Sequence, residues 1–304
     1  MKTSCRALAL IAGIMLCLVS LAAVPAHALD MSVGAIGWLS EWRPFFFPAF
    51  NEPGFASYDS IEKSGEKTMG EPKPLIGPVL GINFSPRWGL TMTGTYGDYG
   101  PVKKTYSGMA SAIDFNGTNE IKASKLDVDA TVNYNLTSVF KIFTGIKVFR
   151  YGFEEKRDIY ESASTIHISY GVKGEMSGLM LGLGIGTTFR LFGNLYMLAN
   201  VSANLLGGDA YYKETHYSQS GVPVATVVRP NKDIRDGNAG SWGGNGTIAL
   251  AYYAESWSTT FTLGVRGQFI KYKISNKNLE QVGLTNKLDA FYGITFSAVY
   301  SFEL

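Results

Sequence analysis

The stretch KLDVDATVNYNL, residues 125–136, alternates between polar and apolar side chains without a break. Lysine, aspartate, threonine and asparagine occupy the odd positions, while leucine, valine, alanine and tyrosine occupy the even ones. Successive side chains of a β-strand point to opposite faces, so this period of two predicts a strand with one polar and one apolar face. The alternation continues for about a dozen residues, well beyond the usual strand of five or six.

The same alternation recurs along the chain and predicts ten strands. They cover residues 31–40, 75–85, 90–98, 124–136, 139–152, 176–189, 195–206, 245–254, 258–270 and 289–304. Short connections follow Ser85, Leu136, Phe189 and Ala254, and long polar ones cover 41–74, 98–123, 153–175, 207–244 and 271–288. Eight or twelve strands are the alternatives, because segments 31–40 and 166–172 can be assigned either way. In the first of these, Ile36 and Trp38 compete with Val33, Ala35 and Leu39 for the apolar face.

A soluble sandwich alternates too, but three features favour a closed barrel that crosses a membrane. The strands reach the 9–11 or so residues that a tilted crossing needs. The polar face is rich in Gly, Ser, Thr and Asn, as a lumen is. Aromatic residues gather at the strand ends and predict two girdles: Phe84, Trp88, Phe140, Phe189 and Trp257 on the turn side, and Tyr96, Tyr151, Tyr211, Phe269 and Tyr272 on the loop side. The predicted fold is an all-β, antiparallel up-and-down transmembrane barrel with short periplasmic turns and long extracellular loops.

The first 28 residues are typical of a cleaved secretory signal peptide. Lys2 and Arg6 precede an apolar run that ends in Pro25-Ala26-His27-Ala28, with small residues before the expected cut. Both cysteines lie in this segment, and removing its two basic residues from the 27 Lys and Arg leaves 25, equal to the 25 Asp and Glu. The predicted mature chain, residues 29–304, is therefore neutral and free of thiols. This excludes a disulfide framework and gives no basic excess for nucleic acid.

With these features, residues 29–304 resemble the bacterial outer-membrane β-barrel proteins as a class. The closing Tyr300-Ser301-Phe302-Glu303-Leu304 is similar to the C-terminal strand that such proteins present to the barrel-assembly machinery, although the class usually ends in Phe. The resemblance implies export through the periplasm, a place in the outer membrane, and contact with its lipid and with the assembly machinery.

Asp127 and Asp129 raise the alternative of an enzyme. Residues two apart share a strand face, so both carboxylates are expected in the lumen. Omptin proteases are ten-stranded barrels that use an Asp pair and an Asp–His pair near the outer rim, but here Asp209 and His216 are seven residues apart. The competing interpretation is that the aspartates pair with Lys125, Lys147 or Arg266 and hold the lumen shut.

The other candidate motifs are weaker. His167 with Ser169, and His216 with Ser218, have the spacing of a hydrolase pair on one strand face, but Ser is abundant in this chain. The two histidines predict no zinc site, and the Asn and Asp residues of segment 231–238 do not have the spacing of a calcium loop. The run Gly182-Leu183-Gly184-Ile185-Gly186 is interpreted as a strand with a glycine lumen face, which leaves room for side chains from across the barrel.

Ten strands enclose a narrow lumen, and this leads to two functional hypotheses. The first is a restricted or gated channel for small solutes. The second is a closed barrel whose long loops bind an extracellular ligand, as an adhesin or receptor does. No catalytic residue, metal or other cofactor is predicted. The expected lumen-lining residues are Lys125, Asp127, Asp129, Asn133, Lys141, Lys147, Arg266 and Gln268. The first loop is expected to contact the barrel mouth or the outer leaflet through Phe45, Phe46, Phe47 and Phe50.

Overall fold

The computed structural model describes residues 29–43, 71–110, 113–161, 167–207, 211–220, 232–235, 239–274 and 286–303. Nearly all of them lie in β-strands, and a single 3-10 turn, Glu255–Trp257, is the one helical element in these ranges. No helix among the described residues has the length and apolar character to cross a membrane. The predicted signal peptide and the Phe-rich part of the first loop, with Phe45, Phe46, Phe47 and Phe50, lie outside the described residues, so both stay predictions.

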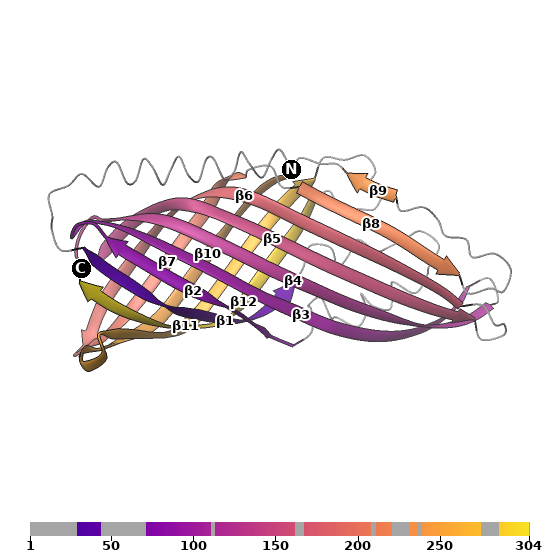
Figure 1. The fold of residues 1–304 in the computed structure, drawn as a ribbon, viewed down its shortest axis with the longest axis horizontal. Coiled ribbons are helices and arrows are strands. Elements are labelled where there is room, and N and C mark those ends of the chain that lie inside the picture. Colours follow the sequence, from indigo (N-terminus) through magenta and orange to yellow (C-terminus); the bar gives the residue numbers. More distant parts are fainter. Residues whose placement is uncertain are drawn as a thin grey trace.

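Ten strands close into one antiparallel barrel (Figure 1). They are β1 (Asp30–Arg43), β2 (Lys73–Asn83), β3 (Trp88–Ala110), β4 (Ile113–Asn135), β5 (Phe140–Glu161), β6 (His167–Phe192), β7 (Leu195–Gly207), β10 (Ala239–Ala254), β11 (Thr259–Ile274) and β12 (Asn286–Glu303). Each pairs with its neighbour in this order, and β12 pairs back onto β1. The predicted all-β up-and-down barrel and its count of ten strands are confirmed.

The short connections lie together at one end of the barrel. They occupy residues 84–87, 136–139, 193–194 and 255–258, as the sequence predicts. Gly193 lies in one of them at φ 51, a left-handed conformation that glycine adopts without strain. Asp30 pairs with both Asn83 and Glu303, so the two ends of the barrel sequence lie on this turn side.

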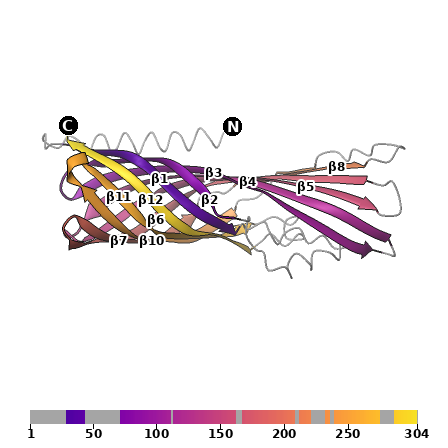
Figure 2. The same cartoon turned by 90° about the horizontal axis from the view of Figure 1, so that it is seen from below.

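The opposite end differs from the prediction, because four strands continue far beyond the barrel (Figure 2). The segments 98–123 and 153–175 were expected to be loops, but most of their residues extend β3, β4, β5 and β6. Two further strands, β8 (Tyr211–Ser220) and β9 (Lys232–Arg235), continue this sheet beside β6. We call this extension, from residue 102 of β3 round to β9, the projecting sheet. Charged side chains such as Lys103 and Lys156 are exposed on it, so it lacks the outward apolar face of the barrel strands.

The apolar face of the barrel points outward. Ile185 and Leu263 are 61% and 63% exposed, and comparable side chains project from the other barrel strands. In β1, Val33 and Leu39 are exposed, whereas Trp38 is buried, so the ambiguity of that strand is resolved in favour of Val33 and Leu39.

Aromatic side chains mark both ends of the apolar surface. Trp88, Phe140, Phe189 and Trp257 are exposed at the turn side, and Tyr96 and Phe269 are exposed toward the loop side, while Phe84 is half-buried. The side chains of Tyr211 and Tyr272 lie outside the described part of the chain. Placing Tyr151 in the outer girdle was wrong. Its side chain is 1% exposed inside the barrel, because it shares the inward face of β5 with Lys147.

Candidate functional site: a lumen closed by charges and rings

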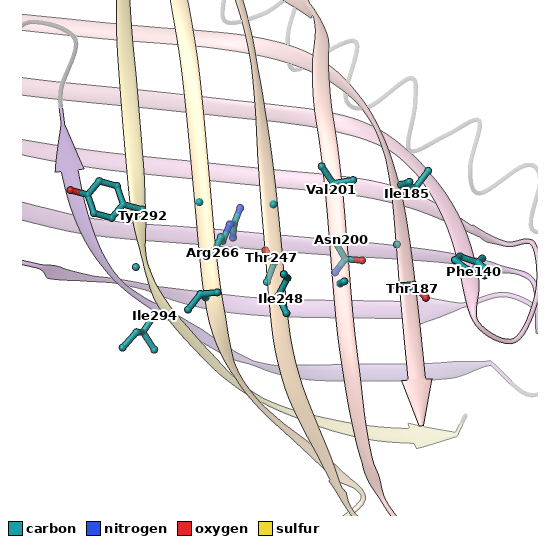
Figure 3. Close-up of a pocket in the computed structure, with 16 residues that line it drawn as sticks. Phe140, Ile185, Thr187, Asn200, Val201, Thr247, Ile248, Arg266, Tyr292 and Ile294 are labelled. Carbon is teal, nitrogen blue, oxygen red and sulfur yellow. The ribbon is translucent and has the colours of Figure 1, made fainter. Parts of the chain in front are cut away.

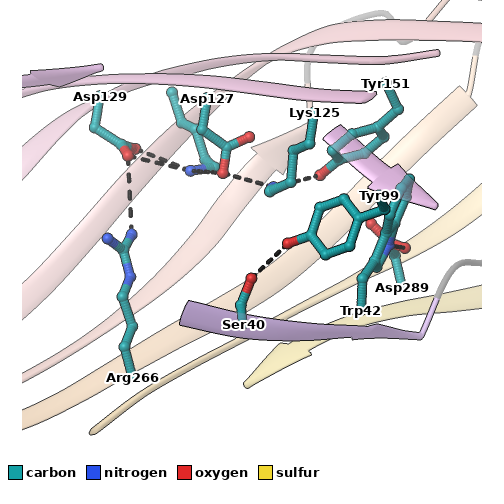
Figure 4. A network of polar contacts seen from close by, with 10 residues as sticks. Ser40, Trp42, Tyr99, Lys125, Asp127, Asp129, Tyr151, Arg266 and Asp289 are labelled. Atoms are coloured by element: carbon teal, nitrogen blue, oxygen red, sulfur yellow. Dashed lines mark hydrogen bonds and ion pairs between the residues drawn. The ribbon is translucent and has the colours of Figure 1, made fainter. Parts of the chain in front are cut away.

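A network of buried ion pairs crosses the lumen (Figure 4). The Lys125 Nζ lies 2.6 Å from Asp127 Oδ2, and Lys147 Nζ lies 3.0 Å from the same oxygen. Lys147 also contacts Asp129 Oδ2 at 3.1 Å, and Arg266 reaches that oxygen at 3.9 Å. Lys125, Asp127 and Lys147 are at most 3% exposed. We call Lys125, Asp127, Asp129, Lys147 and Arg266 together the charge network.

The strand register explains how the network forms. Odd-numbered residues of β4 face inward, so Lys125, Asp127 and Asp129 are stacked at intervals of two along one strand. Lys147 of β5 lies directly opposite Asp129, which brings the two side chains together across the β4–β5 pair. Arg266 completes the network from β11 on the far wall.

An aromatic layer fills the lumen on the loop side of the network. Four side chains form its centre: Trp42, Tyr99, Tyr151 and Phe291, each at most 1% exposed. Trp42 stacks on Phe291 with ring centroids 5.1 Å apart and meets the edge of Tyr99 at 5.0 Å. Such ring pairs each contribute about 0.5–1.5 kcal/mol beyond the area they bury. No open passage for a solute is left where rings of this size are fully buried.

Lys125 joins the aromatic layer to the charge network. Its ammonium lies 3.9 Å from the centre of the Phe291 ring and 4.7 Å from that of Tyr151, and it donates a hydrogen bond of 3.3 Å to the Tyr151 hydroxyl. Cation–π attraction and Asp127 together compensate the ammonium for its loss of water. On the loop side, the Trp42 indole donates a 2.7 Å hydrogen bond to Asp289 Oδ1, and Ser40 is hydrogen-bonded to Tyr99.

A polar cavity of about 220 Å³ extends from the charge network toward the short turns. Asp129, Lys147 and Arg266 form its boundary with the network, and most of the other lining side chains are amides and hydroxyls, together with Lys141 and Phe143. One wall is held by a 3.0 Å hydrogen bond from Asn133 Nδ2 to Thr91 Oγ1. The interior therefore changes along its axis, from aromatic rings through paired charges to a mainly polar lining that includes Lys141.

The glycine run of β6 makes room for this lining. A side chain at Gly186 would overlap Lys141 and Asn200, and one at Gly184 would overlap the ring of Phe143. The glycines thus face the lumen, as predicted. The side chains they accommodate come from the adjacent strands β5 and β7, not from across the barrel.

All eight residues expected to line the lumen lie on the inward face: Lys125, Asp127, Asp129, Asn133, Lys141, Lys147, Arg266 and Gln268. The aromatic layer was missed at the sequence level. A signal for it exists, because Phe149 and Tyr151 continue the inward series Lys141, Phe143, Gly145 and Lys147 along β5. Aromatic residues at strand ends were instead interpreted as girdles.

The alternative chemistries gain no support from the described geometry. Asp127 and Asp129 are engaged by lysines inside the lumen, not displayed at the outer rim where an omptin-like site is expected. Asp209 and the side chains of His167 and His216 lie outside the described part. Within that part, no three His, Cys, Asp or Glu side chains are grouped to hold a metal.

The outer wall carries an apolar groove of about 760 Å³ across β6, β7, β10, β11 and β12 (Figure 3). Ile185, Val201 and Ile248 are among the side chains that line it, and Gly246 and Gly267 lie opposite each other within it. A Cβ at either glycine would meet no atom closer than 3.8 Å. This groove belongs to the exposed surface, and Arg266 of the charge network is among the residues that line it.

Among known proteins, similarity to this chain was found only with solved structures. No protein-family model and no curated protein matches the chain. A major outer membrane protein from Thermus thermophilus is 12% identical, with a TM-score of 0.35 over 91% of this chain and 100% of that one. CarO of Acinetobacter baumannii is 11% identical, with a TM-score of 0.31 over 86% and 96%. The translocator domain of the autotransporter NalP from Neisseria meningitidis is 11% identical, with a TM-score of 0.36 over 98% and 97%. At these scores, the likenesses assign no function to the chain.

Proposed function

We propose that this protein is an outer-membrane β-barrel that acts as a narrow channel for small solutes and is closed in the conformation described. Three features support a membrane location. The ring of strands has no free edge, its outer face is apolar, and aromatic residues lie at both ends of that face. A barrel that crosses hydrocarbon needs all three, because unpaired backbone groups and exposed charges are costly there.

The observation that carries the channel proposal is the polar cavity that adjoins the charge network. Side chains just fill an eight-stranded barrel, and ten strands enclose a wider lumen. In this barrel, a space of about 220 Å³ remains and is lined mainly by amides, hydroxyls and charges. Polar atoms around it, including Arg266 Nε and Asn204 Nδ2, have no hydrogen-bond partner among the described residues, so water or a solute would satisfy them.

The charge network provides a means of opening. Lys125 and Lys147 both contact one oxygen of Asp127, so this carboxylate holds two ammonium groups together. Loss of one member of a buried ion pair leaves an uncompensated charge and costs about 3–5 kcal/mol. Displacement of Asp127 would therefore drive the lysines apart and draw Lys125 out of the aromatic layer.

Conductance of the purified protein in planar bilayers tests the proposal. Asp127→Asn keeps the shape of the side chain but removes its charge, and we expect longer and more frequent openings than in the unaltered protein. Glu175→Gln is the matched control, because it breaks an exposed 2.8 Å pair with Arg150 on the outer face. Exposed ion pairs contribute about 0–1 kcal/mol to stability, so the conductance of Glu175→Gln should match that of the unaltered protein. An absence of openings at any voltage, in both the unaltered protein and Asp127→Asn, would exclude a channel.

The projecting sheet supports a second candidate function, the binding of an extracellular ligand. Beyond Tyr96, β3 has no β2 partner, yet β3 and β4 remain paired as far as Ala110 and Ile113. Lys103 bonds to Glu120 at 3.3 Å and Glu120 to Lys122 at 2.7 Å, which gives this sheet a charged surface. These lysines hold the pKa of Glu120 below its usual value, so the carboxylate stays ionised in mildly acidic surroundings.

A shortened hairpin tests the second function without disturbing the barrel. Lys103 and Glu120 are paired in register, so residues 104–119 can be replaced by Asn-Gly, which favours a two-residue hairpin turn. Cells that display the intact protein are expected to adhere to a film of extracellular-matrix extract, and cells with the shortened hairpin are not. Heat-modifiable gel mobility would verify that the barrel still folds. Equal adhesion by both proteins would reject this role for the hairpin.

A further inference from the structure

A row of polar side chains crosses the turn-side wall of the lumen. Lys141 of β5 is paired in register with Gly186, Gly186 with Asn200, Asn200 with Thr247, and Thr247 with Arg266. Register partners lie side by side on one face, so the four side chains form one continuous inward row. Gly186 supplies the gap through which Lys141 approaches Asn200.

The cationic groups at this row are not balanced by carboxylates. Among the described residues, no carboxylate lies within ion-pair distance of the Lys141 ammonium. Arg266 has a single ion-pair contact, at 3.9 Å to Asp129, and Asp129 is already bound by Lys147. The cavity is thus lined by Lys141, Lys147 and Arg266 against Asp129 alone.

Unused donors face the same space. Asn204 is 5% exposed and lines the cavity, and its Nδ2 has no partner among the described residues. The Nε of Arg266 is likewise unpartnered within them. Buried donors are nearly always satisfied, so an acceptor is expected in the cavity. Guanidinium and ammonium groups beside amide donors form a set that matches the oxygens of a small oxyanion.

We propose that the cavity is a binding site for a small oxyanion of the size and charge of phosphate or sulfate, held by Lys141 and Arg266. The geometry favours an anion over a neutral polar solute because Lys141 is half-buried and has no counter-charge among the described residues. Binding does not require the charge network to open, so the inference goes beyond the channel proposal. A protein that never conducts can still bind the anion, and the two proposals can fail separately.

Titration calorimetry of the full-length protein, folded in detergent micelles, tests the site with sodium sulfate and sodium phosphate as probes. Sodium chloride at equal ionic strength corrects for screening. We expect saturable binding of at least one oxyanion, weakened at least tenfold by Lys141→Gln and retained by Lys141→Arg. Lys103→Gln is the matched control, because this lysine is 72% exposed on the projecting sheet, and it should bind like the unaltered protein.

Two results would overturn the proposal. One is the absence of saturable binding by the unaltered protein, which needs no variant to interpret. The other is equal affinity in Lys141→Gln and Lys103→Gln. Retained heat-modifiable mobility of each variant would show that weakened binding reflects the lost ammonium and not a lost fold.

Discussion

At the scale of single residues, glycine serves two different purposes within β11. Gly264 faces inward, where a Cβ would overlap the carbonyl oxygen of Ile248 and the side chain of Ala249. Gly267 lies in the outer groove, and the nearest atom to its Cβ position is 4.0 Å away. The first glycine is required by close backbone packing, whereas the second leaves a depression that another side chain could fill.

This contrast predicts opposite effects of one substitution at two positions on one strand. Gly264→Ala should lower the free energy of unfolding by about 1–3 kcal/mol, because the added methyl forces neighbouring strands apart. Gly267→Ala should leave it unchanged or raise it by up to about 1 kcal/mol, through reduced freedom of the unfolded chain. Urea unfolding followed by tryptophan fluorescence measures both. Equal destabilisation by the two changes would mean that the packing around Gly264 is not what requires glycine there.

At the scale of elements, the sequence predicts strands well where one face meets an apolar environment. The boundaries of β7 and β11 were predicted to within four residues, because Val201 or Leu263 alternates with polar partners there. The extensions of β3 to β6 were missed because exposed charges, such as Lys103 and Lys156, interrupt the apolar series that marks the barrel strands.

The closure of the lumen could be predicted only in part: the pairing of charges was expected, but the aromatic layer was not. Charges inside a barrel must pair, so Asp127 was expected to meet Lys125 or Lys147. The aromatic layer depends on the tilt and stagger of the strands, which bring Trp42 of β1 against Phe291 of β12 and Tyr99 of β3. Stagger is a property of the whole ring, and no local pattern records it.

At the scale of the whole molecule, the barrel has an inverted distribution of polarity. Its buried interior holds Lys125, Asp127 and Lys147, while its most exposed apolar side chains, such as Leu263, project outward. In water this arrangement would leave a continuous apolar belt exposed. In a bilayer, the same belt contacts lipid chains instead of water, so its exposure carries no penalty. The barrel wall separates the interior charges from the lipid.

The inversion makes a substitution on the outer face the sharpest test of the environment. Leu263 lies midway along β11 between Trp257 and Phe269, so it is expected at the centre of the hydrocarbon. Leu263→Arg should then destabilise the protein folded in lipid vesicles by about 2–4 kcal/mol. Ser256→Arg, in the turn, should destabilise it by only about 0–1 kcal/mol. On a water-exposed face, arginine at a position 63% exposed would be nearly neutral. A cost at Leu263 no larger than that at Ser256, measured by urea titration in vesicles, would therefore remove the membrane-spanning orientation on which the channel proposal depends.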